Sequence, residues 1–132
     1  MIRKKELDDA NFEIRFYEGI LEKKPCFIEV LAALGDLYTC NGFYRQGLEM
    51  DERLYQLRPG EPVILYNLAC SYSLLDDKDK AFRAIKHAIH CGYDDFEHLE
   101  ADKDLDNLRA DRRFTRYFER IRGRKRSEVP DT

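Results

Sequence analysis

Residues 28–59 read IEVLAALGDLYTCNGFYRQGLEMDERLYQLRP, and residues 62–93 read PVILYNLACSYSLLDDKDKAFRAIKHAIHCGY. Four positions of the first segment, Leu31, Leu34, Gly35 and Tyr38, correspond to similar residues 34 positions later. These are Leu65, Leu68, Ala69 and Tyr72. A pattern of this length is typical of stacked helix hairpins, in which each unit buries its apolar faces against its neighbours. The repeat therefore predicts an array that presents a surface to a partner and does not enclose a catalytic pocket.

Proline, glycine and polar turns mark where the expected helices end. Pro25 stops a first helix because proline lacks the N–H that a continuing helix needs, and Asn41-Gly42 ends the next one. The expected helices span residues 6–24, 27–41 and 44–57, then a segment from Pro62 to the polar turn 76–79, and finally residues 80–90. In the first helix, one face is expected to carry Phe12, Phe16, Ile20 and Leu21.

The two segments resemble the tetratricopeptide repeat (TPR), whose small and large apolar positions they match in phase. The positions that depart from the family pattern are Gly47, Asp51 and Leu54 in the first repeat and Tyr93 in the second. The resemblance implies an all-α TPR helix-hairpin array, a right-handed α-solenoid. It comprises a half-repeat helix 6–24, a repeat 28–59 and a repeat 62–93.

Two oppositely charged segments follow the second repeat. Residues 94–111 hold eight acidic against two basic residues, and residues 112–126 hold eight basic against one acidic residue. The apolar residues spaced through them are Phe96, Leu99, Leu105, Leu108, Phe114, Tyr117, Phe118 and Ile121. Because the last repeat needs an amphipathic cover, we expect residues 94–122 to form a C-terminal cap with a capping helix, within one domain of residues 1–122. Residues 123–132 are expected to be a polar, disordered tail.

In such a stack, the resemblance places the first helix of each hairpin along a concave groove. The partner-binding positions that follow are Glu29, Ala32, Asp36, Thr39 and Cys40, then Val63, Tyr66, Asn67, Cys70, Ser73 and Leu74. Asn67 and Tyr66 would suit a peptide, because an amide pairs with backbone groups and a phenol gives an aromatic surface. In the alternative interpretation, Asn67 holds the geometry between helices and Tyr66 packs under the cap.

Motifs for metal or catalytic chemistry are incomplete. The run Asp102 to Asp106 resembles a calcium loop but lacks its glycine and its bidentate glutamate, so helix capping by Asp102 and Asp104 and pairing with the last helix's arginines are expected instead. His87 and Cys91 share a helix face, yet a metal needs three or four ligands. The four cysteines are expected to be reduced. We therefore expect no enzyme, cofactor or metal.

The partner is expected to be a protein or peptide, held by a non-enzymatic adaptor or scaffold. The alternative is binding to nucleic acid or an anionic membrane through the basic segment 112–126, although a net charge of −3 does not favour nucleic acid. A homo-oligomer through the first helix, around Phe12 and Phe16, is a further hypothesis. The sequence shows no secretory signal and no transmembrane segment, so a cytoplasmic location is expected.

Overall fold

The computed structural model describes residues 4–128, and all of its regular elements are helical. The hairpin helices are α1 Lys4–Lys23, α2 Ile28–Cys40, α3 Tyr44–Leu57, α4 Pro62–Leu74 and α5 Lys78–His90. The elements after the second hairpin are α6 Phe96–Ala101, the 3-10 helix η1 Lys103–Leu105, α7 Asp106–Arg109 and α8 Arg112–Glu128. This arrangement confirms the predicted all-α fold.

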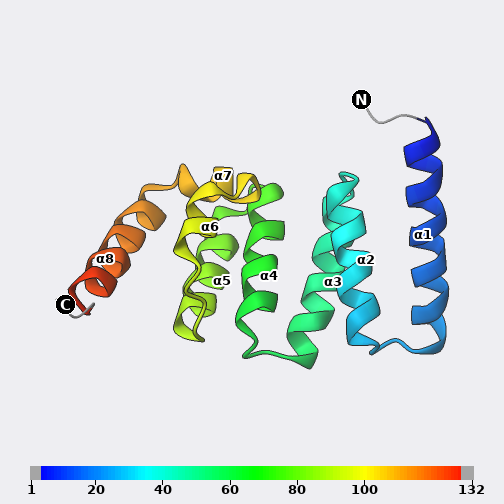
Figure 1. The fold of residues 1–132 in the computed structure, drawn as a ribbon, viewed down its shortest axis with the longest axis horizontal. Helices are drawn as coiled ribbons and strands as arrows, with labels where there is room; N and C mark the ends of the chain where they lie inside the picture. Colours follow the sequence, from blue (N-terminus) through cyan, green and yellow to red (C-terminus); the bar gives the residue numbers. More distant parts are fainter. Residues whose placement is uncertain (1–3, 129–132) are drawn as a thin grey trace.

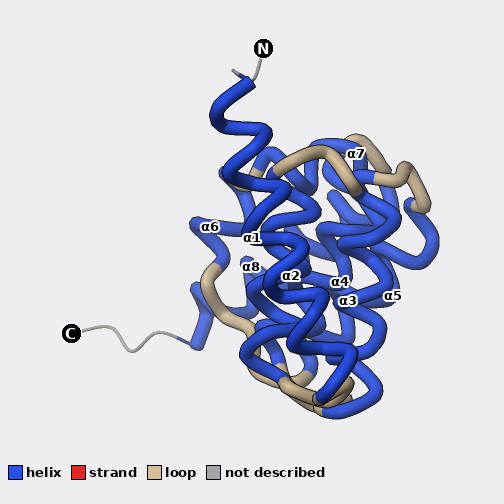
Figure 2. Tube along the Cα trace, turned by 90° about the vertical axis from the view of Figure 1, so that its right-hand side faces the viewer, coloured by secondary structure: helices blue, strands red, loops and turns tan. Residues whose placement is uncertain are grey.

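The five hairpin helices lie side by side along one axis, in chain order from α1 to α5 (Figure 1). The end-on view of Figure 2 shows α1 in front of the stacked helices, and α8 lies at the opposite end of the axis in Figure 1. η1 and α7 both pack on α4, so the chain returns from α5 across the second hairpin before α8 begins. The cap therefore covers part of the repeat as well as its open end.

The buried side chains form two clusters, one for each half of the array. The first cluster includes Ile14, Leu21, Leu31, Leu34, Met50 and Leu54, and the second includes Leu65, Leu68, Ile85, Leu99, Leu105, Leu108, Phe114 and Phe118. The apolar residues expected in the cap are thus core residues, with Tyr117 and Ile121 half-buried beside them. Burial of this apolar area is what holds the cap to the second hairpin.

The face predicted for the first helix is wrong in part. Leu21 is buried as expected, together with Ile14 two turns earlier, and Ile20 is half-buried. Phe12 and Phe16 lie on the other side of α1 and are 72% and 58% exposed. α2 covers the side of α1 that carries Ile14 and Leu21, so Phe12 and Phe16 are left on the uncovered side.

Contacts in the structure explain two departures from the repeat pattern. A Cβ at position 47 would overlap Thr39 Oγ1, so α2 and α3 can approach closely only because Gly47 has no side chain. Asp51 is buried, and it accepts a hydrogen bond of 2.5 Å from the Ser71 hydroxyl of α4. At this position a polar link between the two hairpins replaces the usual apolar contact.

The turns inside the two hairpins use different residues for the same backbone conformation. Gly42 has φ 84°, and Asp76, 34 residues later, has φ 60°. After each turn a backbone N–H reaches back to the preceding helix, from Phe43 to Tyr38 O at 2.8 Å and from Asp77 to Tyr72 O at 2.9 Å. α5 begins at Lys78, earlier than predicted, because the Asp77 side chain accepts from Lys80 N and starts the helix directly after the turn.

Replacing Asp76 by glycine is expected to raise the free energy of unfolding by roughly 0.5–1 kcal/mol. Glycine occupies the left-handed region without the steric cost that a Cβ brings. The ion pair that the change removes, Asp76–Lys78 at 3.8 Å, is exposed and contributes little. Urea unfolding monitored by circular dichroism measures the change. The neighbouring Asp77→Gly, which removes a helix cap, should have the opposite sign, and equal effects at both positions would contradict the argument.

The C-terminal helix extends further than expected. α8 continues through Gly123 to Glu128, so residues 123–128 are helical and not the disordered chain that we predicted. The remaining part of the predicted tail, residues 129–132, lies outside the described residues.

Candidate functional site

Two neighbouring clefts lie between α4 and the cap, and one of them extends to α2. The first, the Asp36 cleft, has a volume of about 100 Å³ and is lined by Gly35, Asp36, Thr39, Asp51, Tyr66, Asn67, Cys70, Ser71, His98, Asp102 and Asp104. The second, the Val63 cleft, has a volume of about 390 Å³ and is lined by Pro62, Val63, Tyr66, Asn67, Gly92, Tyr93, Asp94, Asp95 and His98. Tyr66, Asn67 and His98 belong to both clefts, so the two form one continuous depression.

Asp102, at the start of η1, connects the cap to the floor of this depression. Its carboxylate accepts a hydrogen bond of 2.6 Å from the Tyr66 hydroxyl and a weaker one of 3.8 Å from the Cys70 thiol. It also lies 3.3 Å from His98 Nε2 and accepts from Asp104 N at 3.0 Å. Asp102 therefore caps η1 as predicted, while its other contacts tie α4 to the cap.

Tyr66 is held by aromatic contacts as well. Its ring stacks on Tyr93 with centroids 4.4 Å apart, and the His98 ring lies 5.5 Å away. Burial and the bond to Asp102 raise the pKa of the Tyr66 phenol, and burial together with Asp102 raises the pKa of the Cys70 thiol. Both groups are protonated at neutral pH. A thiol in that state is a poor nucleophile, so Cys70 does not indicate catalysis.

The Asp36 cleft is strongly acidic. Burial raises the pKa of Asp51 to about 6, with the Ser71 hydrogen bond opposing the shift and the charges of Asp36 and Glu52 adding to it. Partial burial raises the pKa of Asp36, and burial with the nearby Asp102 charge raises that of Asp104. Carboxylates that destabilise one another in a confined space favour the approach of a cation.

Asn67 presents free hydrogen-bonding groups at the centre of the depression. Its side chain is exposed, and within the described residues its amide forms no hydrogen bond. An asparagine amide offers two donors and one acceptor oxygen. The alternative interpretation, in which Asn67 holds the helices together, has no contact to support it.

Several predicted groove residues line the depression. They are Asp36, Thr39, Val63 and Asn67, which are exposed or half-buried. Glu29, Ala32 and Cys40 are exposed on α2 but line neither cleft, and Leu74 is half-buried near the end of α4. The structure thus places only part of the predicted groove in the clefts.

Three of the predicted groove residues are buried, and two of them, Tyr66 and Cys70, still border the clefts. Tyr66 and Cys70 are buried, and Ser73 is fully buried, where it accepts from Leu108 N at 3.1 Å and offers its carbonyl oxygen to Asn107. The cap occupies these positions because η1 and α7 pack directly on α4. Their hydrogen bonds therefore hold the cap on α4.

The repeat positions did not indicate the acidic residues that other elements contribute. Asp51 comes from α3, and Asp102, Asp104 and His98 come from the cap. The sequence feature that could have indicated Asp51 is its departure from the tetratricopeptide pattern, which has a large apolar residue at this position. The residues of the cap follow no 34-residue pattern, so nothing in the repeat could place them.

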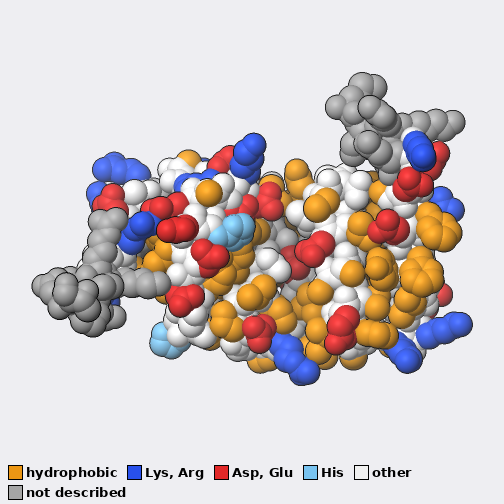
Figure 3. Space-filling view, viewed as in Figure 1, with side chains coloured by type: hydrophobic (Ala, Val, Ile, Leu, Met, Phe, Trp, Pro, Cys, Tyr) orange, Lys and Arg blue, Asp and Glu red, His pale blue; other side chains and the backbone are white. Residues whose placement is uncertain are grey.

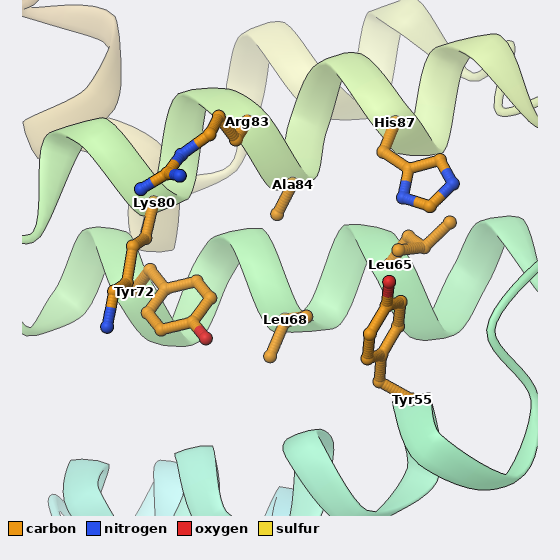
Figure 4. Close-up of a pocket in the computed structure, with 8 residues that line it drawn as sticks. All are labelled: Tyr55, Leu65, Leu68, Tyr72, Lys80, Arg83, Ala84 and His87. Carbon is orange, nitrogen blue, oxygen red and sulfur yellow. The ribbon is translucent and has the colours of Figure 1, made fainter.

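The histidine and cysteine of α5 lie apart from this depression. His87 contacts Tyr55 edge-to-face with centroids 6.3 Å apart, and it lines a separate cleft of about 290 Å³ between α3, α4 and α5 (Figure 4). Lys80 and Arg83 border this cleft and Leu65 and Leu68 form its floor. Within residues 4–128, no group of three or more His, Cys, Asp or Glu side chains is placed to hold a metal ion.

Ion pairs connect the acidic and basic segments of the cap, but they do not involve Asp102 and Asp104, the partners expected for the arginines. Arg113 pairs with Asp79 at 2.7 Å and with Asp111 at 2.6 Å, and Arg122 pairs with Glu100. Arg122 and Arg113 also lie over the rings of Phe118 and Phe82. Two of the arginines considered for nucleic acid or lipid are thus engaged within the fold. Within the described chain, no helix combines the length and hydropathy needed to cross a bilayer.

Comparison with solved structures supports the helical-repeat fold. No family model matches the chain. Two crystal structures of MamA match it with TM-scores of 0.60 and 0.61 at 23% identity, over 81% of this chain and 71% and 66% of theirs. The likeness supports a TPR-like solenoid of helix hairpins.

One curated protein shares part of the sequence. Over 80 residues the chain is 34% identical to a chloroplastic protein of Arabidopsis thaliana. The alignment covers 58% of this chain and 24% of that protein. The chain therefore matches about a quarter of the length of this relative.

Proposed function

We propose that this protein is a non-enzymatic interaction module that binds a basic segment of a protein partner in the depression formed by the Asp36 and Val63 clefts. The observation that supports this most directly is the free amide of Asn67 between a cleft lined by four aspartates and a cleft with an exposed apolar wall. The TPR-like fold agrees with this class of function, since stacked hairpins present extended surfaces to partners.

Each part of the depression would recognise a different part of the segment. The amide of Asn67 would pair with peptide backbone groups, as asparagine can donate and accept at once. Val63, 56% exposed, would pack against an apolar side chain. Asp36 and Asp51 would receive a lysine or arginine side chain, which relieves the repulsion between their carboxylates.

Changing Asn67 to alanine or Asp36 to lysine is expected to weaken binding of a basic peptide by about tenfold or more. The first change removes peptide hydrogen bonds, and the second places a like charge in the cleft. Fluorescence anisotropy with labelled peptides of one length, which are lysine/arginine-rich, neutral or acidic, measures the effect on the intact chain.

Glu29→Lys is the matched control. It makes the same charge change on the same helix, at an exposed position that lines neither cleft. It should alter the affinity only slightly and lose that effect at high salt. Basic peptides that bind Asp36→Lys and Glu29→Lys equally well, or peptides of all three classes that bind alike, would show that the depression is not the site.

A further inference from the structure

One face of α1 is apolar and lies free at an end of the array. Phe12 and Phe16, 72% and 58% exposed, have the largest exposed fractions among the large hydrophobic residues that the structure leaves exposed. Figure 3 shows hydrophobic side chains over the surface at this end. The opposite end differs, since the cap buries Phe114 and Phe118 there. An array of hairpins needs a cover on its terminal apolar faces, and α1 has none within the described chain.

The charges beside this face indicate what covers it. Asp8 and Asp9 lie in the first half of α1, whereas Lys23 ends the helix and Lys24 follows it. All four are exposed, and none forms an ion pair with another described residue. Asp9 and Lys23 are separated by about 21 Å along the helix, at about 1.5 Å per residue. From its beginning to its end the face therefore carries Lys5, the acidic pair Asp8 and Asp9, the aromatic residues and the basic pair Lys23 and Lys24.

A second α1 running in the opposite direction matches this pattern. When Phe16 of each helix lies at the twofold axis, Phe12 faces Ile20 of the other copy, and Asp9 faces Lys23. Asp8 then faces Lys24. Gly19 lies beside the aromatic pair, and no atom approaches the position of its missing Cβ, so the helices can pack closely there. A shift that placed Lys5 opposite Lys23 would bring like charges together, as a parallel pair would.

We propose that two copies of this chain associate through an antiparallel, isologous α1–α1 contact centred on Phe16. The partner is a second copy because the charge pattern of the face is complementary to itself under a twofold rotation. A single pair of 20-residue helices buries less area than the roughly 800 Å² per subunit of standard interfaces, so the dimer forms and dissociates with concentration. It leaves the Asp36 and Val63 clefts open.

Sedimentation equilibrium of the full chain over a wide concentration range tests the dimer. The mass is expected to rise from 15.7 kDa toward twice that value as the concentration increases. Phe12→Ser with Phe16→Ser should keep the chain monomeric by weakening association about 100-fold or more. Because both side chains are exposed, the thermal unfolding midpoint should stay unchanged at low protein concentration, where the wild type is also monomeric. Val63→Ser, an equally apolar exposed position outside α1, is the control and should leave the dimer intact.

A charge exchange tests the antiparallel register. Asp9→Lys should weaken the dimer by about tenfold, because the twofold axis turns two attractions into two repulsions. Adding Lys23→Asp to the same chain should restore it. The dimer proposal is overturned if the chain is monomeric at every concentration, which would leave the face to another protein or segment, or if the serine variant still dimerises. The antiparallel register is overturned if adding Lys23→Asp does not restore the dimer affinity that Asp9→Lys loses.

Discussion

Replacing Leu105 by alanine is expected to lower the free energy of unfolding by about 3–4 kcal/mol, because the side chain is fully buried between η1 and α4 and leaves a cavity when truncated. Urea unfolding measures the loss. The change should also loosen the cap, so Cys70, now buried beneath Asp102, should react faster with a thiol reagent.

Phe12→Ala is the control for Leu105→Ala. It removes a larger apolar side chain, but from a position that is 72% exposed, so at low protein concentration it should change the stability by less than about 0.5 kcal/mol. Exposed Cys26 and Cys40 react in both variants, which separates the additional reaction of Cys70 from the background. Comparable losses of stability at positions 105 and 12 would contradict the described packing of the cap.

Replacing Asp51 by asparagine is expected to stabilise the protein by about 3 kcal/mol at pH 8 and to leave it nearly unchanged at pH 3. The pKa of Asp51 is about 6 in the folded chain against an ordinary value of 3.8. Since the folded state holds this proton more tightly, the contribution of Asp51 to stability is full below pH 3.8 and is lost as the pH rises to about 6. A difference of about two pKa units corresponds to about 3 kcal/mol.

Urea unfolding of the wild type and Asp51→Asn across pH 3 to 8 gives this difference, since titrating groups that do not interact with Asp51 contribute equally to both. Ser71→Ala is the companion variant, because it removes the hydroxyl that donates to Asp51. Its destabilisation should be greatest above pH 6, where the buried carboxylate is charged. A constant offset between wild type and Asp51→Asn at all pH values would show that Asp51 is not held with a raised pKa.

The helices and their order could be predicted because each depends on neighbouring residues. Pro25, Gly42 and Pro62 interrupt or start helices through their own backbone chemistry, and the 34-residue spacing places the same apolar positions on both hairpins. Leu99, Leu105 and Leu108 were correctly assigned to a cap, since an amphipathic segment after the last repeat must cover it.

The candidate site could be predicted only in part. Asp36 and Asn67 face the clefts because the repeat phase orients each hairpin's first helix. Tyr66, Cys70 and Ser73 share that phase, yet the cap covers them, and the periodicity of α4 carries no information on where η1 and α7 will pack. The exposure of Phe12 could not be predicted for the same reason. α1 carries apolar residues on more than one side, and its packing against α2 decides which side is buried.

By itself the sequence determined a solvated array of helix hairpins with a cap, since local breaks and a regular apolar period suffice for that. The tertiary structure alone decided that Asp102 reaches back to Tyr66 and that Asp51 joins Asp36 in one cleft. These residues come from separate elements, and only packing brings Asp36 close enough to raise the pKa of Asp51 and Asp102 close enough to raise the pKa of Tyr66. The physical reason is that helix formation depends on residues within a few turns, whereas burial and electrostatics depend on distances in space.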